Sequence, residues 1–455
     1  MKIYPGLQAC VLALLCQACS SISDPNNHYA EQAQAAPGTI SQWQQSTDSG
    51  VTVTSLLQLV NLNQLDALVS EALSHNPGLQ QTLVTLKKSR VQETTAAAEG
   101  RPQISAGVQN SRSENSNSTY TTSVDISWEL DLWNRIGDSI SAAQWQSEQA
   151  SSDYQAAQNT LAASVIQAYL QIISQQQLLT IEQQRLQVLQ NSESVILTRY
   201  RSGLGTLDDL DTARTSSAST RATIADYENS LRAARRSLAV LLGRTDMDTS
   251  DINSARDFPD IVPPLSGIPE QDLARRPDLQ SAFAQIKASE ASEQVAYKNL
   301  LPSLNISAAL SDSGQTPALS FFKDPVWSLL GSVTAPLFQG GALKASLKQA
   351  KLDSLNTWWA YQQTLLTAVQ EVEDTLDRET SYQIRQSHLL NAYDNAQRSK
   401  QTYTSQYRQG LVDILDLLSV TQTTYDLKAQ LVQLQQNQLS NRIDLGLALG
   451  LGVSS

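Results

Sequence analysis

Residues 120–132 read YTTSVDISWELDL, and their side chains alternate strictly in character. Every odd position in this stretch is Thr, Ser, Asp or Glu, whereas the even positions are Tyr, Thr, Val, Ile, Trp, Leu and Leu. Successive side chains of a β-strand point to opposite faces. The stretch therefore predicts a strand with one apolar face and one polar face.

Three further stretches show the same alternation, so we predict four strands, at about 101–113, 118–132, 302–312 and 325–337. The apolar positions of the other three are Ile104, Ala106 and Val108, then Leu304, Ile306, Ala308 and Leu310, and finally Trp327, Leu329, Val333, Ala335 and Leu337. An apolar face that meets lipid and a polar face that lines a water-filled lumen explain this pattern. Four strands cannot close a barrel, and open strand edges are costly in a membrane. We therefore expect several copies of the chain to complete it.

The chain also repeats itself at long range. The matching segments are NPGLQ at 76–80 with RPDLQ at 276–280, RPQIS at 101–105 with LPSLN at 301–305, and RYRSGL at 199–204 with QYRQGL at 406–411. A spacing of about 200 residues is far longer than a solenoid repeat, so it indicates a duplicated structural half. We predict halves at 62–244 and 268–452, joined by a linker at 245–267. An N-terminal segment, 19–61, would wrap the body.

Each half contains a very long stretch without Gly or Pro. Residues 138–202 and 342–409 lack both helix breakers, and the runs 206–242 and 411–445 follow them. These four ranges predict two antiparallel helical hairpins, in which the longer helices would each span roughly 100 Å. Such helices need neighbours to be stable. Their many Gln and Ser residues indicate that one face meets water.

The composition excludes several classes of function. The net charge is −12 and no basic run is present, which argues against nucleic acid as a partner. The three histidines, His28, His75 and His388, are scattered, and no phosphate-binding loop is recognisable. Gly446, Gly450 and Gly452 follow a helical pattern, so we interpret them as helix termination and close packing. We expect no enzyme activity, no cofactor and no metal site.

All three cysteines, Cys10, Cys16 and Cys19, lie at the N-terminus. Residues 1–18 have the charge and apolar stretch of a secretory signal. The segment before Cys19 resembles a bacterial lipoprotein signal, with Cys16 as a competing position. We therefore predict lipid attachment at Cys19. Because Ser20 follows it, the resemblance to bacterial lipoproteins favours the outer membrane.

From about residue 62 to residue 452 the chain resembles outer-membrane efflux factors of the TolC/OprM (NodT-like lipoprotein) family. The residues that carry the resemblance are Leu65-Asp66-Ala67-Leu68, Asn76-Pro77, Trp128 to Trp133, Pro336 to Gly341, and the turns Tyr200 to Gly203 and Tyr407 to Gly410. The resemblance implies a mainly α fold with a small β part. In it, long antiparallel helical hairpins form a periplasmic tunnel, and four strands per chain contribute to a trimeric transmembrane β-barrel.

The resemblance also implies a function and partners. The chain would be the passive outer-membrane duct of a tripartite efflux system, lipid-anchored in the outer membrane with its tunnel in the periplasm. A periplasmic adaptor (a membrane fusion protein) and an inner-membrane pump, of the resistance–nodulation–division type, would deliver substrates. Two alternatives stay open: a trimeric coiled-coil structural or adhesive lipoprotein, and a type I secretion channel. The cargo is not specified by the sequence.

The candidate functional residues lie at the two helical turns. Asp208 and Asp209 follow the first turn, and Asp413 and Asp416 follow the second. In a trimer they would form carboxylate rings that attract cations, although carboxylates in a first turn also complement the helix dipole. By the resemblance, Asp416 matches a constriction position, whereas Ser419 replaces a deeper acidic one.

Two further groups flank these carboxylates. Tyr200, Arg201, Tyr407 and Arg408 are candidates for tying neighbouring hairpins shut, or alternatively for ordinary packing at the turns. We expect adaptor docking at Gly203, Leu204, Gly410 and Leu411, because a Leu beside a Gly turn can insert into a partner's helical hairpin.

Overall fold

The computed structural model describes residues 28–40, 42–44, 51–60, 63–114, 117–250, 252, 257–264 and 269–453. The predicted signal peptide and Cys19 lie outside these residues. The helices are α2 (Tyr29–Ala35), α3 (Asn63–His75), α4 (Pro77–Glu99), α5 (Arg135–Arg201), α6 (Leu207–Leu242), α7 (Pro269–Arg275), α8 (Pro277–Lys298), α9 (Ala342–Arg408) and α10 (Ile414–Ala448). The strands are β1 (Gln103–Ser111), β2 (Thr119–Leu130), β3 (Ser303–Gly314) and β4 (Val326–Thr334). Within the described residues, no helix is long and apolar enough to cross a membrane.

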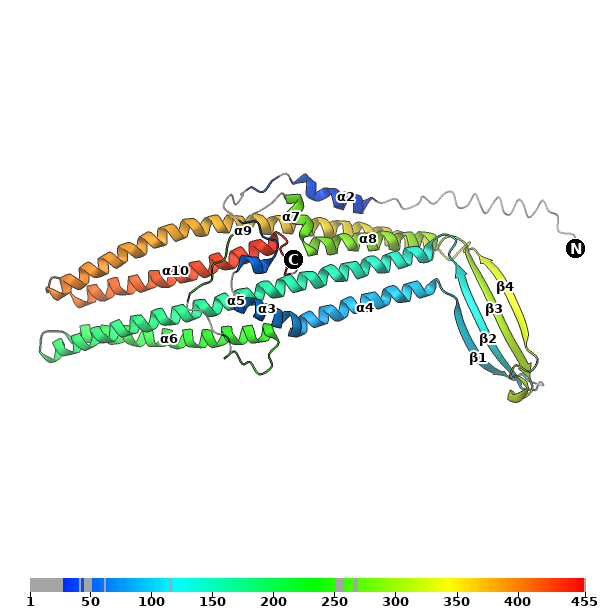
Figure 1. Ribbon diagram of the computed structural model, residues 1–455, viewed down its shortest axis with the longest axis horizontal. Coiled ribbons are helices and arrows are strands. Elements are labelled where there is room, and N and C mark those ends of the chain that lie inside the picture. Colours follow the sequence, from blue (N-terminus) through cyan, green and yellow to red (C-terminus); the bar gives the residue numbers. More distant parts are fainter. Residues whose placement is uncertain are drawn as a thin grey trace. The chain divides into compact units, whose positions relative to one another are not determined.

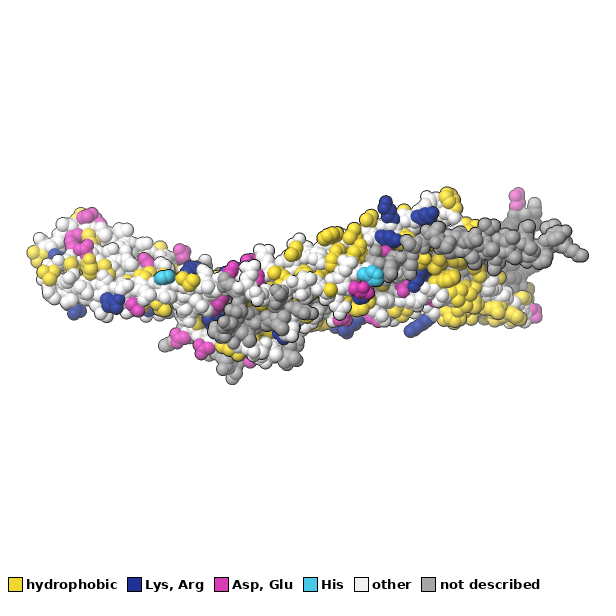
Figure 2. Space-filling view, turned by 90° about the horizontal axis from the view of Figure 1, so that it is seen from above, with side chains coloured by type: hydrophobic (Ala, Val, Ile, Leu, Met, Phe, Trp, Pro, Cys, Tyr) yellow, Lys and Arg dark blue, Asp and Glu magenta, His cyan; other side chains and the backbone are white. Residues whose placement is uncertain are grey.

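The four strands form one antiparallel sheet in the order β1-β2-β3-β4 (Figure 1). Because β2 pairs with β3, the two sequence halves share this sheet. Its register places the apolar positions in rows, two of which are Ile104–Ile126–Ala308–Leu329 and Ala106–Val124–Leu310–Trp327. Hydrophobic side chains gather over the strands in Figure 2. The predicted mainly α fold and its two-faced sheet are confirmed.

Strands β1, β2 and β4 end earlier than predicted, whereas β3 continues to Gly314, two residues beyond its predicted end. The reason for an early end is clearest in β4. The apolar alternation continues to Leu337, but the strand stops at Thr334. Pro336 cannot donate a ladder hydrogen bond, so the pairing ends before it. Ala335 and Leu337 therefore lie outside the sheet.

The helices α5 and α9 have 67 residues each, which corresponds to about 100 Å at 1.5 Å per residue. Helix α5 begins at Arg135, before Gly137, rather than at residue 138. Asp131 accepts hydrogen bonds from the backbone N–H groups of Arg135 (2.7 Å) and Gly137 (2.9 Å). This cap satisfies N–H groups that a helix start otherwise leaves free, so glycine is tolerated in the first turn.

Helix α10 spans Ile414–Ala448 instead of the predicted 411–445. Its start is delayed because Leu411 still closes the preceding helix and Asp413 caps the new one. At its other end Gly446 lies inside the helix, where a Cβ would come within 2.7 Å of Leu59 Cδ1. Gly450, at φ +76°, follows the helix end. Gly446 therefore allows close packing against Leu59, and Gly450 follows the end of the helix.

The chain divides into two compact units, and both contain parts of each sequence half. Unit 1 comprises residues 1–36, 84–153 and 278–364, and it contains the sheet. Unit 2 comprises residues 37–83, 154–277 and 365–455, and it contains both helical turns. The duplication visible in the sequence therefore does not coincide with the division into compact units.

In unit 1 the helices pack side by side through polar and aromatic contacts. Between α5 and α8, Ser281 donates to Asp153 (2.6 Å) and Lys298 pairs with Asp138 (2.5 Å). Between α8 and α9, Ser289 and Thr357 share a 2.8 Å hydrogen bond. Helix α5 is thus followed by α8 and then by α9 across this unit.

Helix α2 is fastened to α9 within the same unit. Trp358 stacks on both Tyr29 and Tyr361, with ring centroids 6.0 and 6.1 Å apart. The Tyr361 hydroxyl donates to the carbonyl of Ala33 at 2.7 Å. Burial raises the pKa of Tyr361 to about 12, so the hydroxyl keeps its proton and remains a donor.

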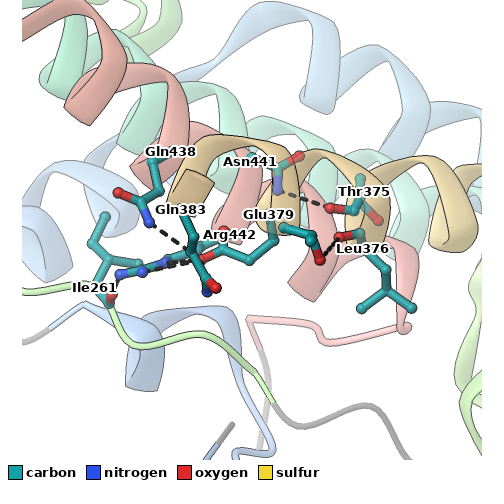
Figure 3. A network of polar contacts seen from close by, with 9 residues as sticks. Ile261, Thr375, Leu376, Glu379, Gln383, Gln438, Asn441 and Arg442 are labelled. Atoms are coloured by element: carbon teal, nitrogen blue, oxygen red, sulfur yellow. Dashed lines mark hydrogen bonds and ion pairs between the residues drawn. The ribbon is translucent and has the colours of Figure 1, made fainter. Parts of the chain in front are cut away.

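Unit 2 has a large aliphatic core and a buried polar network around Arg442. Its core includes Leu56, Ile166, Leu170 and Leu238, all fully buried. In the network, Arg442 binds Glu379 Oε1 (3.1 Å) and the carbonyl of Ile261 (2.6 Å). Figure 3 shows Arg442 between these two groups. This arginine therefore fastens the linker around Ile261 to both α9 and α10.

Candidate gate at the helical turns

Both helical hairpins turn with the same backbone geometry. Gly203 and Gly410 adopt positive φ values of +71° and +76°. After the first, the N–H of Leu204 bonds to the carbonyl of Arg199 (2.8 Å), and after the second, the N–H of Leu411 bonds to that of Gln406 (2.9 Å). This pattern, with glycine in the left-handed region, closes a helix with its last carbonyls satisfied. The repeated Gly-Leu pair thus builds two equivalent turns.

The helices that follow the turns are capped by two of the predicted carboxylate residues. Thr206 and Asp209 form a reciprocal capping box, with hydrogen bonds of 3.1 Å in each direction. Asp413 is the N-cap of α10 and accepts from the N–H of Ile414. Asp209 and Asp413 therefore stabilise helix starts, as such residues commonly do. This structural role coexists with their charge.

The two turns pack against each other through a small hydrophobic cluster. Its buried members are Leu189, Ile196, Leu210, Ala213, Ile414 and Leu418, with Tyr407 half-buried beside them. Next to this cluster lies a cavity of about 330 Å³, lined among others by Arg199, Leu204, Asp209, Asp413 and Ile414. The structure thus brings together carboxylates from the two sequence halves.

Arg199 is the functional candidate that the sequence reasoning missed. Its guanidinium donates to the carbonyl of Leu204 (3.3 Å) and lines the cavity with Asp209 and Asp413. Hydrogen bonds from Thr206 lower the pKa of Asp209, and the charge of Arg199 lowers it further. The available signal was the position of Arg199 at the start of the repeated RYRSGL segment.

The other candidates lie outside this cavity. Asp208 and Asp416 are exposed, as are Arg201 and Arg408. Among the residues that the structure describes, the side chains of these four make no ion pair with another part of the chain. Tyr200 is exposed as well, whereas Tyr407 packs on the hydrophobic cluster. Among the described side chains of one chain, Arg201 and Arg408 therefore form no ion pair between the two hairpins, whereas Tyr407 packs on the cluster that both hairpins share.

Further from the turns, polar contacts connect α5 to α10. Lys428 donates to Gln184 (3.3 Å), Gln436 donates to Gln171 (2.7 Å), and Gln167 donates to Asp444 (2.6 Å). Burial raises the pKa of Asp444, and the Gln167 hydrogen bond partly opposes this. The Gln residues that are frequent in the sequence thus join the two hairpins.

An ionic cluster around Arg185 also connects α5 to α10. This residue binds Asp426 at 2.5 Å and Glu182 at 3.3 Å, and it lies over the ring of Tyr425. The Glu182 side chain is only 5% exposed, and its Oε2 atom has no hydrogen-bond partner in the described chain. Burial raises the pKa of Glu182, against the opposing effect of Arg185.

Comparison with known proteins places these features in a family. The family model described as outer membrane efflux protein matches residues 68–244 and 268–451. The pyoverdine export outer membrane protein OpmQ of Pseudomonas aeruginosa is 28% identical, with 100% of this chain and 98% of OpmQ covered. The probable outer membrane lipoprotein SilC of Salmonella typhimurium is 27% identical, with 86% of each chain covered.

The fold recurs in solved structures. The outer-membrane channel OprN superimposes with a TM-score of 0.82 at 23% sequence identity, covering 91% of this chain and 97% of OprN. The CmeC outer membrane channel of Campylobacter jejuni gives a TM-score of 0.82 at 18% identity, with 91% of each chain covered. These similarities concern the arrangement of strands and long helices.

Proposed function

The chain belongs to the outer membrane efflux protein family, and from this premise we propose that three copies form a passive duct gated at the helical turns. Its role as an outer-membrane channel of an efflux system follows from the family and the fold. The family match also favours the channel over a coiled-coil adhesive lipoprotein. The proposal adds the number of copies, the gate, the partners and the lipid anchor at Cys19.

The sheet supports assembly from several copies. Strands β1 and β4 are its two outer strands, so each copy has two edges able to pair with a neighbour. Its apolar residues are exposed in the single chain, with Ile104 at 71% and Trp327 at 76%. A barrel closed by neighbouring copies satisfies the edges and turns these residues toward lipid.

Charge at the turns supports the gate. Each copy has Asp209 and Asp413 at one cavity with Arg199, and Asp416 exposed one turn further along α10. With three copies around one axis, these carboxylates form a ring that favours cations. Contacts between copies, made by Arg201 and Arg408, would hold this ring narrow. Opening then requires a partner that binds the open state more tightly.

Exposed leucines support docking of an adaptor at the same turns. Leu204 is 71% exposed and Leu411 is 69% exposed, each directly after the glycine of its turn. Large exposed apolar side chains at a defined turn are suited to a partner's helical groove. A lipid-anchored channel of this kind fits a periplasmic adaptor and a pump of the resistance–nodulation–division type. In this scheme the pump selects the cargo.

The first test is conductance in a planar lipid bilayer. The purified protein should have the native mass of three chains and should conduct ions with a preference for cations. Replacing Asp413 and Asp416 with Asn removes six charges from the proposed ring, and Asn retains N-cap ability. The reversal potential under a KCl gradient should therefore move toward zero.

Asp226→Asn, an exposed carboxylate of α6 away from the turns, is the matched control and should leave the reversal potential unchanged. An unaltered reversal potential in the Asp413→Asn, Asp416→Asn variant would show that these carboxylates do not make the channel selective for cations. Absence of conductance from a correctly folded trimer would count against the duct itself.

The second test concerns docking. Replacing Leu204 and Leu411 with Glu places charges where an adaptor's apolar groove would bind. Adaptor affinity, measured by surface plasmon resonance with the co-expressed adaptor, should fall at least tenfold, while bilayer conductance persists. Leu319→Glu, an exposed leucine between β3 and β4, is the control and should not alter affinity. If the unmodified protein, the Leu204→Glu, Leu411→Glu variant and the Leu319→Glu control bind the adaptor equally well, the adaptor does not dock at these two leucines.

A further inference from the structure

We propose that Lys344, Lys348 and Lys351 of α9 form a binding site for the headgroups of anionic phospholipids in the periplasmic leaflet of the outer membrane. The inference rests on the proposed barrel and lipid anchor, because it needs a sheet whose apolar face meets lipid. It adds a class of ligand and the residues that bind it. All of the described residues that carry it belong to unit 1.

The three lysines lie along one side of the first turns of α9. Their positions are i, i+4 and i+7, the spacing of residues that share one side of a helix. Lys344 and Lys348 are exposed, and Lys351 is partly exposed. Among the residues that the structure describes, none of these side chains has an ion-pair or hydrogen-bond partner. Exposed lysines are common on protein surfaces, so the ligand has to be inferred from where these three lie.

The apolar surface of the sheet continues almost to the start of α9. Val333 in β4 is 72% exposed, and beyond the strand Leu337 and Phe338 are 82% and 87% exposed. Gly340 and Gly341, both with positive φ, then lead into the helix. In the proposed barrel such exposed apolar side chains meet the hydrocarbon layer. The segment after Phe338 therefore lies at the edge of that layer.

The lysines are within reach of the headgroups that cover this edge. Their Cα atoms lie about 3, 9 and 14 Å from the start of α9, at a rise of 1.5 Å per residue. The headgroup region adds roughly 5–7 Å on each side of the hydrocarbon core. In an α-helix each Cα–Cβ bond leans toward the N-terminus, which for α9 is the end at the sheet. The three long side chains therefore extend toward the membrane, as lysines near a bilayer commonly do.

The contact with α2 indicates that the lysines face outward rather than into the lumen. Lys344, Lys351 and Trp358 follow one another at seven-residue spacing, so they lie on one side of α9. Tyr29 of α2 stacks on Trp358. The proposed lipid anchor, Cys19, is ten residues before Tyr29, and an anchor in the membrane has to be outside the duct. The side of α9 that binds α2 is therefore its outer side.

The chain itself supplies little negative charge for this side of α9. The first turn of α9 contains no acidic residue. Asp353 is two positions from Lys351, which places it on the opposite side of the helix. In residues 1–28 the sequence contains a single acidic residue, Asp24. A surface of anionic lipid supplies the missing charge, because clustered lysines next to a bilayer attract such lipids.

Helix α4 has a basic group that differs from this one in its direction. Lys87, Lys88 and Arg90 are all exposed. They lie about 14–18 Å from the end of α4 at Glu99, which is the end nearest the sheet. Because that end is the C-terminus, their Cα–Cβ bonds lean away from the membrane. These three residues have the same total charge as the lysines of α9 and form a matched control.

Lipid binding by the full-length, detergent-purified protein tests the site. The protein is titrated with phosphatidylglycerol or with phosphatidylethanolamine, which has no net charge, and bound lipid is counted by native mass spectrometry. One lysine near an anionic surface contributes about fivefold in affinity, so replacing all three with Gln should weaken phosphatidylglycerol binding at least about tenfold. Phosphatidylethanolamine binding should be unchanged. The control Lys87→Gln, Lys88→Gln, Arg90→Gln should bind both lipids like the unmodified protein.

Two further arms identify the interaction as one with charged lipid. Replacing the three lysines of α9 with Arg keeps the charge and should keep the preference for phosphatidylglycerol. Raising NaCl from about 0.05 to about 0.5 M should weaken this preference, because salt screens exposed charges. Sodium phosphate at equal ionic strength should displace no more lipid than NaCl does. Stronger displacement by phosphate would show a site for free phosphate and would overturn the lipid site.

Equal phosphatidylglycerol binding by the Gln variant and the unmodified protein would also overturn the lipid site. If the Gln variant instead shifts the reversal potential in the bilayer assay, the lysines line the lumen. Native mass and conductance of the same samples separate these outcomes from failure of the duct. A trimeric, conducting Gln variant with an unchanged lipid preference refutes the lipid site alone, whereas an unmodified protein that does not conduct counts against the duct.

Discussion

Replacing Arg442 with alanine is expected to lower the free energy of unfolding by about 3–5 kcal/mol. Arg442 is the ionic partner of Glu379, whose side chain is only 3% exposed. Without the guanidinium, that carboxylate stays buried without a counter-charge, while the carbonyl of Ile261 loses a donor. Breaking one half of a buried pair is more damaging than removing both halves.

Thermal unfolding followed by circular dichroism at 222 nm measures this effect. The double variant Arg442→Met, Glu379→Leu should recover most of the lost stability, because both charges are removed together. Arg385→Ala, an exposed arginine on the same helix as Glu379, is the control and should cost less than about 1 kcal/mol. A small effect of Arg442→Ala, equal to that of the control, would show that Glu379 reaches solvent or another partner.

The second large effect is expected for Arg185→Ala. This change breaks the Arg185–Asp426 pair between α5 and α10 and leaves Glu182 buried without its cation. At neutral pH the cost should again be about 3–5 kcal/mol. Because the two hairpins lose an ionic connection, we also expect a higher basal conductance in the bilayer assay.

The effect of Arg185→Ala should depend on pH. Burial raises the pKa of Glu182 above its ordinary value of 4.5, so the folded protein holds this proton more tightly than the unfolded chain. The resulting stability is fully present below pH 4.5 and is lost as pH rises through the folded-state pKa. Removing Arg185 raises that pKa further. The variant should therefore lose less stability at pH 4.5 than at pH 7.5.

Unfolding scans at both pH values test this expectation. Adding Glu182→Gln to Arg185→Ala should remove the pH dependence that Glu182 contributes and restore part of the stability at pH 7.5. Arg214→Ala, a half-exposed arginine of α6 paired with Glu193 at 3.7 Å, is the control, with an expected cost below about 1 kcal/mol. An Arg185→Ala variant that is equally destabilised at both pH values would contradict the account.

The parts of the fold that follow from local pattern were predictable. The alternation in residues 120–132 predicted β2, and the absence of Gly and Pro after Gly137 predicted the length of α5. Helix ends were less predictable, because capping by Asp131 and Asp413 depends on backbone geometry at single residues. The helical segment before each strand pair is divided into two helices at Asn76 and Arg276, each of which precedes a proline.

The positions of the two helical turns were predicted, but the contacts around them were not. Gly203 and Gly410 were recognisable as turns because glycine accommodates positive φ. The grouping of Asp209 and Asp413 around Arg199 was not, since these residues meet only after the two hairpins pack. The same holds for Glu379 and Arg442, which are 63 positions apart on different helices. No local sequence pattern reports such pairs.

The equal length of α5 and α9 restricts how this chain can change during evolution. Both have 67 residues, so each copy reaches its two turns after the same helical rise. Deleting one residue from α5 alone would shorten it by 1.5 Å and rotate everything beyond by 100°. The buried residues of α5 beyond the deletion, such as Ile166 and Leu170, would then no longer face the hydrophobic core. Length changes are therefore tolerable only when both hairpins change together, by roughly whole heptads in every helix.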